Sequence, residues 1–363
     1  MPELVEVDIA QVDIEAELCT QVAAVAAAGG QIEIVGSGSK RFYGEPVEAL
    51  AVEVAAHSGV IDYDPAELVI TLRAGCRLAE VEQLLADNGQ MFAFEPPHLG
   101  EDATIGGMVA SGLAGPRRAY AGSIRDYVLG VKIIDGRGQV QQFGGRVIKN
   151  VAGFDLSRLM VGSLGTLGIL LEVSIRVIPV FECEVSLAFE HDELKQHLHW
   201  VNDIAGSPFP LSASTWQSVG HSGQSLIRLS GSEQGVAAAT AKLGGERFDF
   251  DWSMLKEQTS AFFTETDKLT RVALPPTSKD VLADSAQLVE WGGAQRWLQG
   301  EQDLAQLRAL VESHGGSVCA YRNHDDVDIF HPLKPAILKL QRSLKSSFDP
   351  AGIFNVGRIY AGL

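Results

Sequence analysis

Residues 96–112 read PPHLGEDATIGGMVASG, and this stretch is the most informative part of the chain. Of its four glycines, Gly100, Gly106, Gly107 and Gly112, the last three stand among other small residues. Glycine lets another group approach the backbone closely, whereas a pair of glycines inside a helix costs about 2 kcal/mol relative to alanine. We therefore expect this stretch to be neither an ordinary helix nor a strand, but a backbone surface that a ligand approaches. The alternative is a helix that packs tightly on a sheet.

A second glycine-rich segment, residues 35–40 with the sequence VGSGSK, follows a β-prone run at residues 31–35. It lacks the third glycine of a dinucleotide fingerprint, because Arg41 occupies that position, and residues 42–44 do not begin a helix. What remains is a strand followed by a turn whose N–H groups can hold an anion, with Lys40 adding a positive charge. A plain surface turn would also fit this segment alone. Together, the two segments predict two backbone cradles around a long ligand that carries phosphate groups.

Three further segments are weaker signals when each is taken separately. Residues 161–169 (VGSLGTLGI) place glycines where a strand begins, which often marks only a turn. Residues 149–155 (KNVAGFD) supply polar groups or simply the start of a helix. Residues 348–358 (FDPAGIFNVGR) are rich in Pro, Gly and Asn close to the C-terminus, where chains normally fray. We expect another part of the protein to hold this ending in place.

The composition is that of a globular protein large enough for two cores. The chain has 363 residues, of which 46% are hydrophobic and 21% are charged. Its net charge of −17 argues against a nucleic acid or an anionic membrane as a partner bound by bulk electrostatics. No apolar run reaches the ~20 residues of a membrane-spanning helix. Residues 1–15 lack the basic cluster of a targeting signal, so we expect an intracellular location.

Four cysteines, Cys19, Cys76, Cys183 and Cys319, are isolated from one another in the sequence. Iron–sulfur clusters and structural zinc ions need clustered thiolates. The sequence therefore predicts neither kind of site, and we expect these cysteines to be buried side chains.

Local patterns predict alternating strands and helices over the first 180 residues and a second α/β unit after Pro179. Apolar residues recur at helical spacing over residues 78–85, and residues 135–138 (DGRG) are typical of a hairpin turn. The predicted strands are residues 31–35, 68–73, 127–134, 139–143, 168–177 and 225–229. The predicted helices are residues 78–85, 154–160, 191–203, 232–243, 302–313 and 334–346.

In this order and spacing, the segments resemble a known family of flavoproteins. The residues that carry the resemblance are 36–40, 95–98, 103–109, 112–118, 149–160 and 348–358. They are similar to the bacterial glycolate oxidase FAD-binding subunit, the E subunit, in the vanillyl-alcohol oxidase superfamily with its PCMH-type FAD-binding domain. The resemblance covers nearly the whole chain, most closely over residues 30–180 and at the C-terminus.

The resemblance implies an α+β fold class with three regions. A two-lobed PCMH-type FAD-binding domain would occupy residues 1–180, and a smaller α/β cap domain, ferredoxin-like α+β in type, would occupy residues 181–330. A C-terminal helix and tail, residues 331–363, would return to the flavin. Some relatives attach the flavin covalently to a histidine of the first glycine loop. No histidine stands there in this chain, so we expect non-covalent FAD.

The resemblance also implies which residues bind the cofactor. Those wrapping the pyrophosphate would be Gly36, Ser37, Gly38, Ser39 and Lys40. Those following the flavin and its ribityl chain would be Pro97, His98, Thr104, Gly106, Gly107, Ser111 and Gly112. The backbone near Gly165, Gly168 and Ile169 would meet the nucleotide. Asn355 and Arg358 would reach the ring region.

The implied reaction is the oxidation of glycolate, a small 2-hydroxyacid, to glyoxylate. The partners implied are a larger FAD-binding subunit and an iron–sulfur subunit that takes the electrons onward, with no nucleic acid and no direct membrane insertion. The implied location is the cytoplasm, or the face of the inner membrane through those partners. Two alternatives stay open: a non-catalytic electron-transfer or assembly subunit, and a self-sufficient D-2-hydroxyacid dehydrogenase. A UDP-N-acetylmuramate-type reductase is a more distant one.

Oxidation of a 2-hydroxyacid needs a cation for the carboxylate, a base for the hydroxyl proton and a flavin as hydride acceptor. His98 is the histidine nearest a predicted flavin segment, but a structural hydrogen bond is the more ordinary role. Arg117, Arg118 and Arg125 could hold the substrate or form salt bridges at the surface. We therefore assign no catalytic residue.

His324, with acidic residues at 325–326 and near His331, is more typical of a solvated loop than of a metal site. Superfamily members that oxidise 2-hydroxyacids often carry a metal-binding histidine pair in the cap domain, and no such pair is identified here. We predict no metal site, and oxidation of the substrate on the larger subunit stays open.

Overall fold

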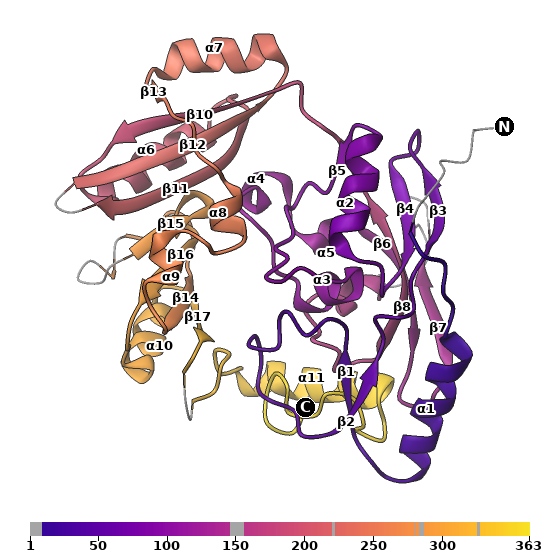
Figure 1. Ribbon diagram of the computed structural model, residues 1–363. Coiled ribbons are helices and arrows are strands. Elements are labelled where there is room, and N and C mark those ends of the chain that lie inside the picture. The colour runs from indigo at the N-terminus through magenta and orange to yellow at the C-terminus, as the bar shows by residue number, and fades with distance from the viewer. Residues whose placement is uncertain (1–8, 146–155, 220–221, 280, 283–286, 325–326) are drawn as a thin grey trace. The chain divides into compact units, whose positions relative to one another are not determined.

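The computed structural model describes residues 9–145, 156–219, 222–279, 281–282, 287–324 and 327–363. The fold is mixed α/β and divides into two compact units (Figure 1). Unit 1 consists of Met1–Leu113, Ser123–Val180 and Pro332–Leu363, and unit 2 consists of Ala114–Gly122 and Phe181–His331. None of the described helices is long and apolar enough to cross a bilayer.

Unit 1 is built on a five-stranded antiparallel sheet with the strand order β3-β4-β8-β6-β7. The strands are β3 (Val60–Asp64), β4 (Val69–Arg73), β6 (Val128–Ile134), β7 (Val140–Gly144) and β8 (Ile169–Arg176). β6 and β7 form the predicted hairpin, and the Gly138 amide donates to the Asp135 carbonyl across its turn. The central strand β8 is buried at six of its eight positions, as expected for a strand covered on both faces.

Two shorter strand pairs complete the β-structure of unit 1. They are the parallel pair β1 (Ile32–Val35) and β2 (Leu50–Glu53), and the antiparallel pair β5 (Gln90–Met91) and β9 (Ile178–Pro179). Its helices are α1 (Glu15–Ala27), α2 (Leu78–Asp87), α3 (Ile105–Ser111), α5 (Ile124–Tyr127), the 3₁₀ helix η1 (Ser157–Met160) and α11 (Pro335–Phe348). The four apolar residues that predicted α2 are all buried, so this helix is confirmed. Of the helix predicted at 154–160, residues 154–155 lie outside the described residues.

One hydrophobic core joins the N-terminal helix, the β1–β2 pair, the large sheet and the C-terminal segment. Leu18 of α1 packs with Ile32 of β1, Ile134 of β6, Leu171 of β8 and Phe354. All five side chains are at most 1% exposed. This core fixes β1, and with it the first glycine-rich segment, on the large sheet.

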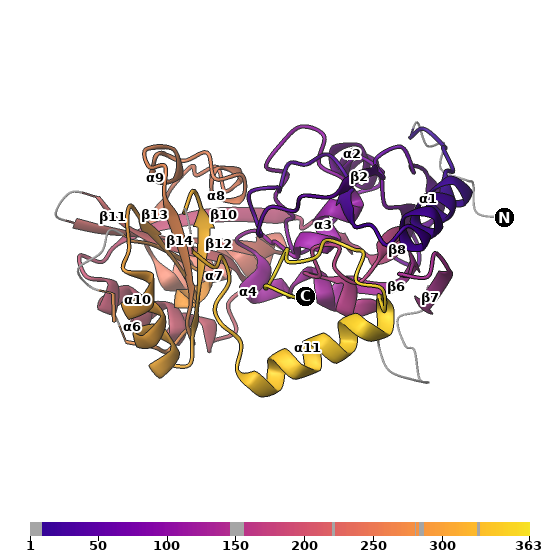
Figure 2. The ribbon, with the colours of Figure 1, turned by 90° about the horizontal axis from the view of Figure 1, so that it is seen from below.

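The C-terminal segment after α11 runs back beside β1. Figure 2 shows this segment in yellow as it returns from the end of α11. The Ile32 amide donates to the Ile353 carbonyl over 2.7 Å, and the Asn355 amide donates to the Ile32 carbonyl over 2.9 Å. Phe354 forms a parallel bridge with Ile32. The expectation that another part of the protein holds this ending is confirmed.

Unit 2 contains an eight-stranded antiparallel sheet with the order β13-β10-β12-β11-β15-β16-β14-β17. Its strands are β10 (Cys183–Glu190), β11 (Leu211–Val219), β12 (Ser222–Gly231), β13 (Glu246–Arg247), β14 (Leu269–Ala273), β15 (Gln287–Glu290), β16 (Gln295–Gln299) and β17 (Ser317–Arg322). Its helices are α4 (Arg118–Ala121), α6 (Leu194–Ala205), α7 (Glu233–Leu243), α8 (Ser253–Lys256), α9 (Ala261–Thr264), α10 (Leu304–Ser313) and the 3₁₀ helix η2 (Trp291–Gly293).

The sequence patterns missed most of this sheet, because several of its strands bury polar side chains. Arg296 in β16 is fully buried, and its guanidinium donates to the carbonyls of residues 278, 279 and 293. Glu290 in β15 is 3% exposed and accepts from the Trp297 indole over 2.8 Å. Buried polar groups with internal partners remove the alternation of apolar and polar residues on which strand prediction depends.

His197 of α6 makes unit 2 sensitive to acid. Its ring is fully buried, and its Nδ1 lies 2.8 Å from the Ser225 hydroxyl. Burial, together with a smaller effect of His191, lowers the pKa of His197 to about 3. The unfolded chain would protonate this histidine near its ordinary pKa of about 6.5. Unfolding therefore takes up a proton below that pH, and stability falls as the pH falls from about 6.5 towards 3.

We expect lowering the pH from 7 to 5 to cost about 2 kcal/mol at this histidine. Urea unfolding followed by tryptophan fluorescence measures it, because the Trp200 ring lies 6.2 Å from the His197 ring, centre to centre. The His197→Gln variant should lose most of this pH dependence. An equal loss of stability in the variant and the native chain would contradict the assignment.

Candidate functional site

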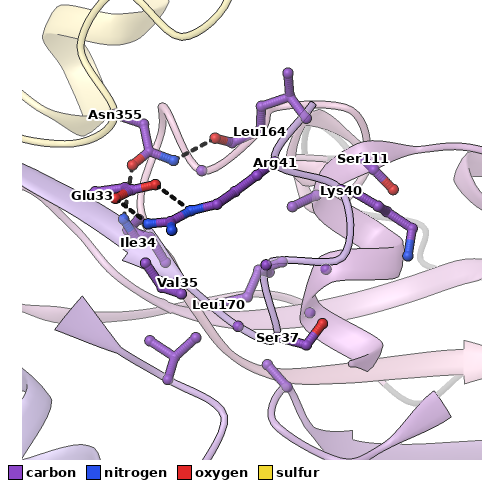
Figure 3. A pocket seen from close by; sticks show the side chains of 18 of the residues that line it. Glu33, Ile34, Val35, Ser37, Lys40, Arg41, Ser111, Leu164, Leu170 and Asn355 are labelled. Carbon is purple, nitrogen blue, oxygen red and sulfur yellow. Dashed lines mark hydrogen bonds and ion pairs between the residues drawn. The ribbon is translucent and has the colours of Figure 1, made fainter. Parts of the chain in front are cut away.

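A groove in unit 1 brings together segments that are far apart in the sequence (Figure 3). It contains about 840 Å³ of space not occupied by protein atoms, part of it open to solvent. Its walls are the end of β1 with the loop after it, α3, the turn before β8 and the C-terminal segment. The lining residues are Glu33, Ile34, Val35, Gly36, Ser37, Gly38, Ser39, Lys40, Arg41, Val54, Ala74, Gly106, Gly107, Ala110, Ser111, Leu164, Gly165, Gly168, Leu170, Asn355 and Arg358.

Most residues predicted to bind the cofactor lie on this groove. They are Gly36, Ser37, Gly38, Ser39, Lys40, Gly106, Gly107, Ser111, Gly165, Gly168, Asn355 and Arg358. Five others, Pro97, His98, Thr104, Gly112 and Ile169, are not among its lining residues. The polar segment at 149–155 lies outside the described residues.

Residues 105–111 of the glycine-rich stretch form the helix α3, so the expectation that this stretch contains no ordinary helix was wrong. The Thr104 hydroxyl caps α3 by accepting from the Gly107 amide over 3.1 Å. Ile105, Met108 and Val109 are buried at helical spacing, and the helix packs against β4 and β8. The helix packed on a sheet that the sequence left open as the alternative is present, and ligand approach to its small residues stays a prediction. The helix presents its small residues to the groove.

The two neighbouring glycines of α3 are required for different reasons. A Cβ at Gly106 would lie 2.9 Å from the Ala74 Cβ, so this glycine lets α3 approach the backbone next to β4. A Cβ at Gly107 would meet only the Thr104 hydroxyl, at 3.2 Å, and the residue lines the groove. Packing also explains why residue 165 is a glycine, because a Cβ built at Gly165 would lie 2.6 Å from the Asn355 Nδ2.

The first glycine loop offers backbone donors to an anion. Among the described residues, the amides of Gly36, Ser37 and Gly38 find no protein acceptor. Gly38 has a φ of +75°, and the Arg41 amide closes the turn by donating to the Gly38 carbonyl over 3.0 Å. Successive amides in such a turn form a concave site for a phosphate group. The loop therefore fits the pyrophosphate of a dinucleotide.

Asn355 ties the C-terminal segment to two walls of the groove (Figure 3). Its side-chain oxygen accepts from the Ile34 amide over 2.8 Å, and its Nδ2 donates to the Leu164 carbonyl over 2.6 Å. Asn355 and Leu164 both have left-handed backbones, with φ values of +40° and +47°. Left-handed residues other than glycine are strained and often mark functional sites, and these hydrogen bonds hold both residues in place.

Arg358 organises the loop rather than presenting its charge to the groove. Its guanidinium donates to the carbonyls of Glu45 over 2.6 Å and Arg41 over 2.8 Å. The residue is 9% exposed, and burial lowers its pKa. The structure places both Arg358 and Asn355 beside the first glycine loop.

The five residues outside the groove lining have structural contacts. Gly112 ends α3 with a φ of +65°, Thr104 begins the helix, and Ile169 is fully buried in β8. The His98 ring lies 2.7 Å from the Glu82 carboxylate, and its carbonyl accepts from the Lys40 ammonium over 2.8 Å. His98 thus supports the groove through Lys40, and Pro97 beside it is buried.

Sequence reasoning missed the ion pair between Arg41 and Glu33 at the groove. Two nitrogens of the Arg41 guanidinium donate to the two carboxylate oxygens of Glu33, over 3.0 Å and 2.5 Å. Glu33 is a single charge within a short strand, a pattern that is ordinary at a surface. The one available signal was Arg41 itself, which stands where a dinucleotide fingerprint has its third glycine.

The candidate substrate arginines have separate environments. Arg117, 3% exposed in unit 2, forms an ion pair with Glu184 and donates to the Ser230 hydroxyl over 3.1 Å. The Arg118 guanidinium lies 4.5 Å from the Trp291 ring centre, and Arg125 is exposed. Among the described residues, no group of three or more His, Cys, Asp or Glu could hold a metal ion. Residues 325–326 lie outside them.

Comparison with known proteins identifies one relative that matches nearly the whole chain and others that match less than half of it. A family described as an FAD binding domain matches residues 9–144. Glycolate oxidase subunit GlcE of Escherichia coli (strain K12) is 43% identical over 331 residues, which cover 91% of this chain and 93% of that protein. D-lactate dehydrogenase of Archaeoglobus fulgidus is 31% identical over 42% of this chain and 34% of its own length. Glycolate oxidase subunit GlcD of Bacillus subtilis (strain 168) is 30% identical over 44% of this chain and 34% of its own.

A solved structure of alkyldihydroxyacetonephosphate synthase has the same fold, with a TM-score of 0.66. It covers 93% of this chain and 73% of its own, at 15% identity, and so bears on the fold alone. The family resemblance found in the sequence is confirmed by the match to GlcE. The chain therefore belongs to the family of glycolate oxidase GlcE subunits among the FAD-dependent oxidoreductases, and its residues 9–144 are an FAD-binding domain of that class.

Proposed function

We propose that this chain binds FAD non-covalently in the groove of unit 1 and serves as the FAD-binding subunit of an assembly that oxidises glycolate to glyoxylate. The observation that carries the proposal is the convergence of both glycine-rich segments and the C-terminal segment on one groove, with backbone donors exposed in the first loop. Family membership supports it, because GlcE of Escherichia coli is named a glycolate oxidase subunit.

The residues of the groove would divide the binding of FAD among them. The amides of residues 36–38 would hold the pyrophosphate, with Lys40 adding charge from a position fixed by the His98 carbonyl. Gly107, Ala110 and Ser111 would give the elongated cofactor a wall of small side chains along α3. Bound FAD would supply the acceptor for the hydride of the alcohol.

We also propose the regional roles that the family suggests. Residues 1–180 would form the two-lobed FAD-binding domain, residues 181–330 the cap domain, and residues 331–363 the tail that returns to the cofactor. The FAD binding domain matches residues 9–144, most of which belong to unit 1. The return of residues 353–355 to β1 supports the role of the tail.

The electrons would pass to partner subunits in the cytoplasm or at the face of the inner membrane. We propose a larger FAD-binding subunit and an iron–sulfur subunit as these partners. The isolated cysteines of this chain support the placing of the iron–sulfur cluster on another subunit, since such a cluster needs clustered thiolates. A non-catalytic assembly role and a self-sufficient D-2-hydroxyacid dehydrogenase are the alternatives to be tested.

A visible absorption spectrum of the purified chain tests the proposal. We expect the chain to bind micromolar FAD and show the bands of an oxidised flavin, and to release the flavin on denaturation. Glycolate should bleach the flavin when the partner subunits are present. Bleaching by glycolate or D-lactate without partners would indicate a self-sufficient dehydrogenase. A chain that takes up no FAD at micromolar concentration would contradict the proposed function.

A further inference from the structure

The described residues that line the groove include three cations, and the protein holds them differently. The Arg358 guanidinium is buried against the carbonyls of the loop at residues 40–45. The Lys40 ammonium donates to the His98 carbonyl over 2.8 Å and lies 3.3 Å from the Ser39 hydroxyl. Moving either cation would break contacts that shape the loop itself.

Arg41 is the cation with the most accessible side chain. Its side chain is 58% exposed, and its guanidinium contacts the Glu33 carboxylate, whose side chain is 15% exposed. Figure 3 shows Arg41 reaching from the glycine loop towards Glu33 of β1. An ion pair with one exposed partner contributes little to stability, because water and salt screen it and the long side chain loses entropy.

We propose that Arg41 determines the affinity of the groove for a diphosphate: it leaves Glu33 and binds the pyrophosphate of FAD, so that Glu33 competes with the cofactor for one guanidinium. This inference rests on the proposed function, the binding of FAD in this groove.

The position of Arg41 supports this exchange. The Arg41 amide closes the turn at Gly38, and a Cβ built on Gly38 would lie 3.6 Å from the Arg41 Cδ. The side chain therefore passes close to the loop that lines the groove and whose amides at residues 36–38 have no protein acceptor among the described residues. A guanidinium binds the oxygens of a phosphate and of a carboxylate with the same paired geometry, so one can replace the other.

The negative charge of the protein explains why the ion pair between Arg41 and Glu33 affects the binding of a diphosphate. The chain carries a net charge of −17, and Glu33 itself lines the groove. In the free protein the ion pair with Arg41 neutralises Glu33. When Arg41 moves to the pyrophosphate, the Glu33 carboxylate loses this partner and repels the diphosphate, so Glu33 opposes cofactor binding both by competing for Arg41 and by its charge.

Titration of FAD into the purified full-length chain tests the inference, because the FAD affinity should change in opposite directions in two variants. We expect Arg41→Gln to weaken FAD binding roughly tenfold or more, because a charge-assisted hydrogen bond is lost. We expect Glu33→Gln to tighten binding about threefold, because the competing carboxylate is removed. The double variant should fall between the native chain and Arg41→Gln. Arg247→Gln and Glu67→Gln, which remove one positive and one negative charge at exposed sites outside the groove lining, should leave the affinity unchanged.

Weaker FAD binding in Glu33→Gln, with circular dichroism like that of the native chain, would overturn the inference. That result would mean either that the ion pair is a fixed part of the groove or that Glu33 itself contacts the cofactor, while the proposed function would stand. Failure of the native chain to bind FAD would overturn the proposed function and the inference with it.

Discussion

Replacing Gly107 by leucine is expected to abolish FAD binding while the chain still folds. Gly107 lies in α3 and lines the groove, and a Cβ built on it meets no protein atom closer than the Thr104 hydroxyl at 3.2 Å. A leucine would therefore occupy the space of the proposed cofactor instead of displacing protein atoms. We expect FAD affinity to fall at least about 100-fold, measured by titration with the free flavin. Leucine favours a helix more than glycine, so α3 should persist.

The neighbouring glycine gives a contrasting variant. A Cβ at Gly106 would lie 2.9 Å from the Ala74 Cβ and 3.1 Å from the Ala74 carbonyl oxygen. Gly106→Ala should therefore lower the free energy of unfolding by about 1–3 kcal/mol through overpacking, whether or not FAD is present. Gly206→Leu, at an exposed helix end in unit 2, serves as the control for adding a leucine. Native FAD affinity in Gly107→Leu would show that the cofactor does not lie along α3.

Removing the Asp349 carboxylate is expected to cost about 3–5 kcal/mol of unfolding free energy, because it leaves a buried ammonium without its counter-ion. Asp349 is 1% exposed, and one of its oxygens accepts from the Lys345 Nζ over 2.7 Å. The carboxylate also accepts from the amides of Ile353 and Phe354, over 3.0 Å and 2.9 Å. The Asp349 carboxylate thus neutralises the Lys345 ammonium of α11 and aligns the segment that returns to β1.

Burial lowers the pKa of Lys345, and Asp349 opposes this by raising it. In Asp349→Ala the pKa of Lys345 should fall further, so the loss of stability should be largest at neutral pH and smaller at alkaline pH. Urea unfolding at several pH values measures this. The double variant Lys345→Met, Asp349→Ala should lose less stability than Asp349→Ala alone, since no buried charge remains. A loss below about 1 kcal/mol in Asp349→Ala would contradict the role given to this pair.

Much of unit 1 could be predicted from local pattern. The helix at residues 78–85 and the hairpin around residues 135–138 follow from spacing and turn chemistry, which depend on neighbours in the sequence. The sheet of unit 2 could not be predicted in this way. Arg296 and Glu290 lie inside its strands, and their partners come from other strands and loops, so only the folded chain satisfies them.

The glycine-rich segments, in their order and spacing, carried the resemblance to the family and with it the kind of cofactor, while their backbone chemistry alone predicted a site for an anion. The tertiary structure alone decided what each glycine is for: Gly106 and Gly165 accommodate neighbouring protein atoms, and Gly107 leaves open space beside the groove. It also decided that Arg358 supports a loop and that Arg41 faces Glu33. These roles depend on distances between residues remote in sequence, and such distances exist only after the chain has closed its core around β1.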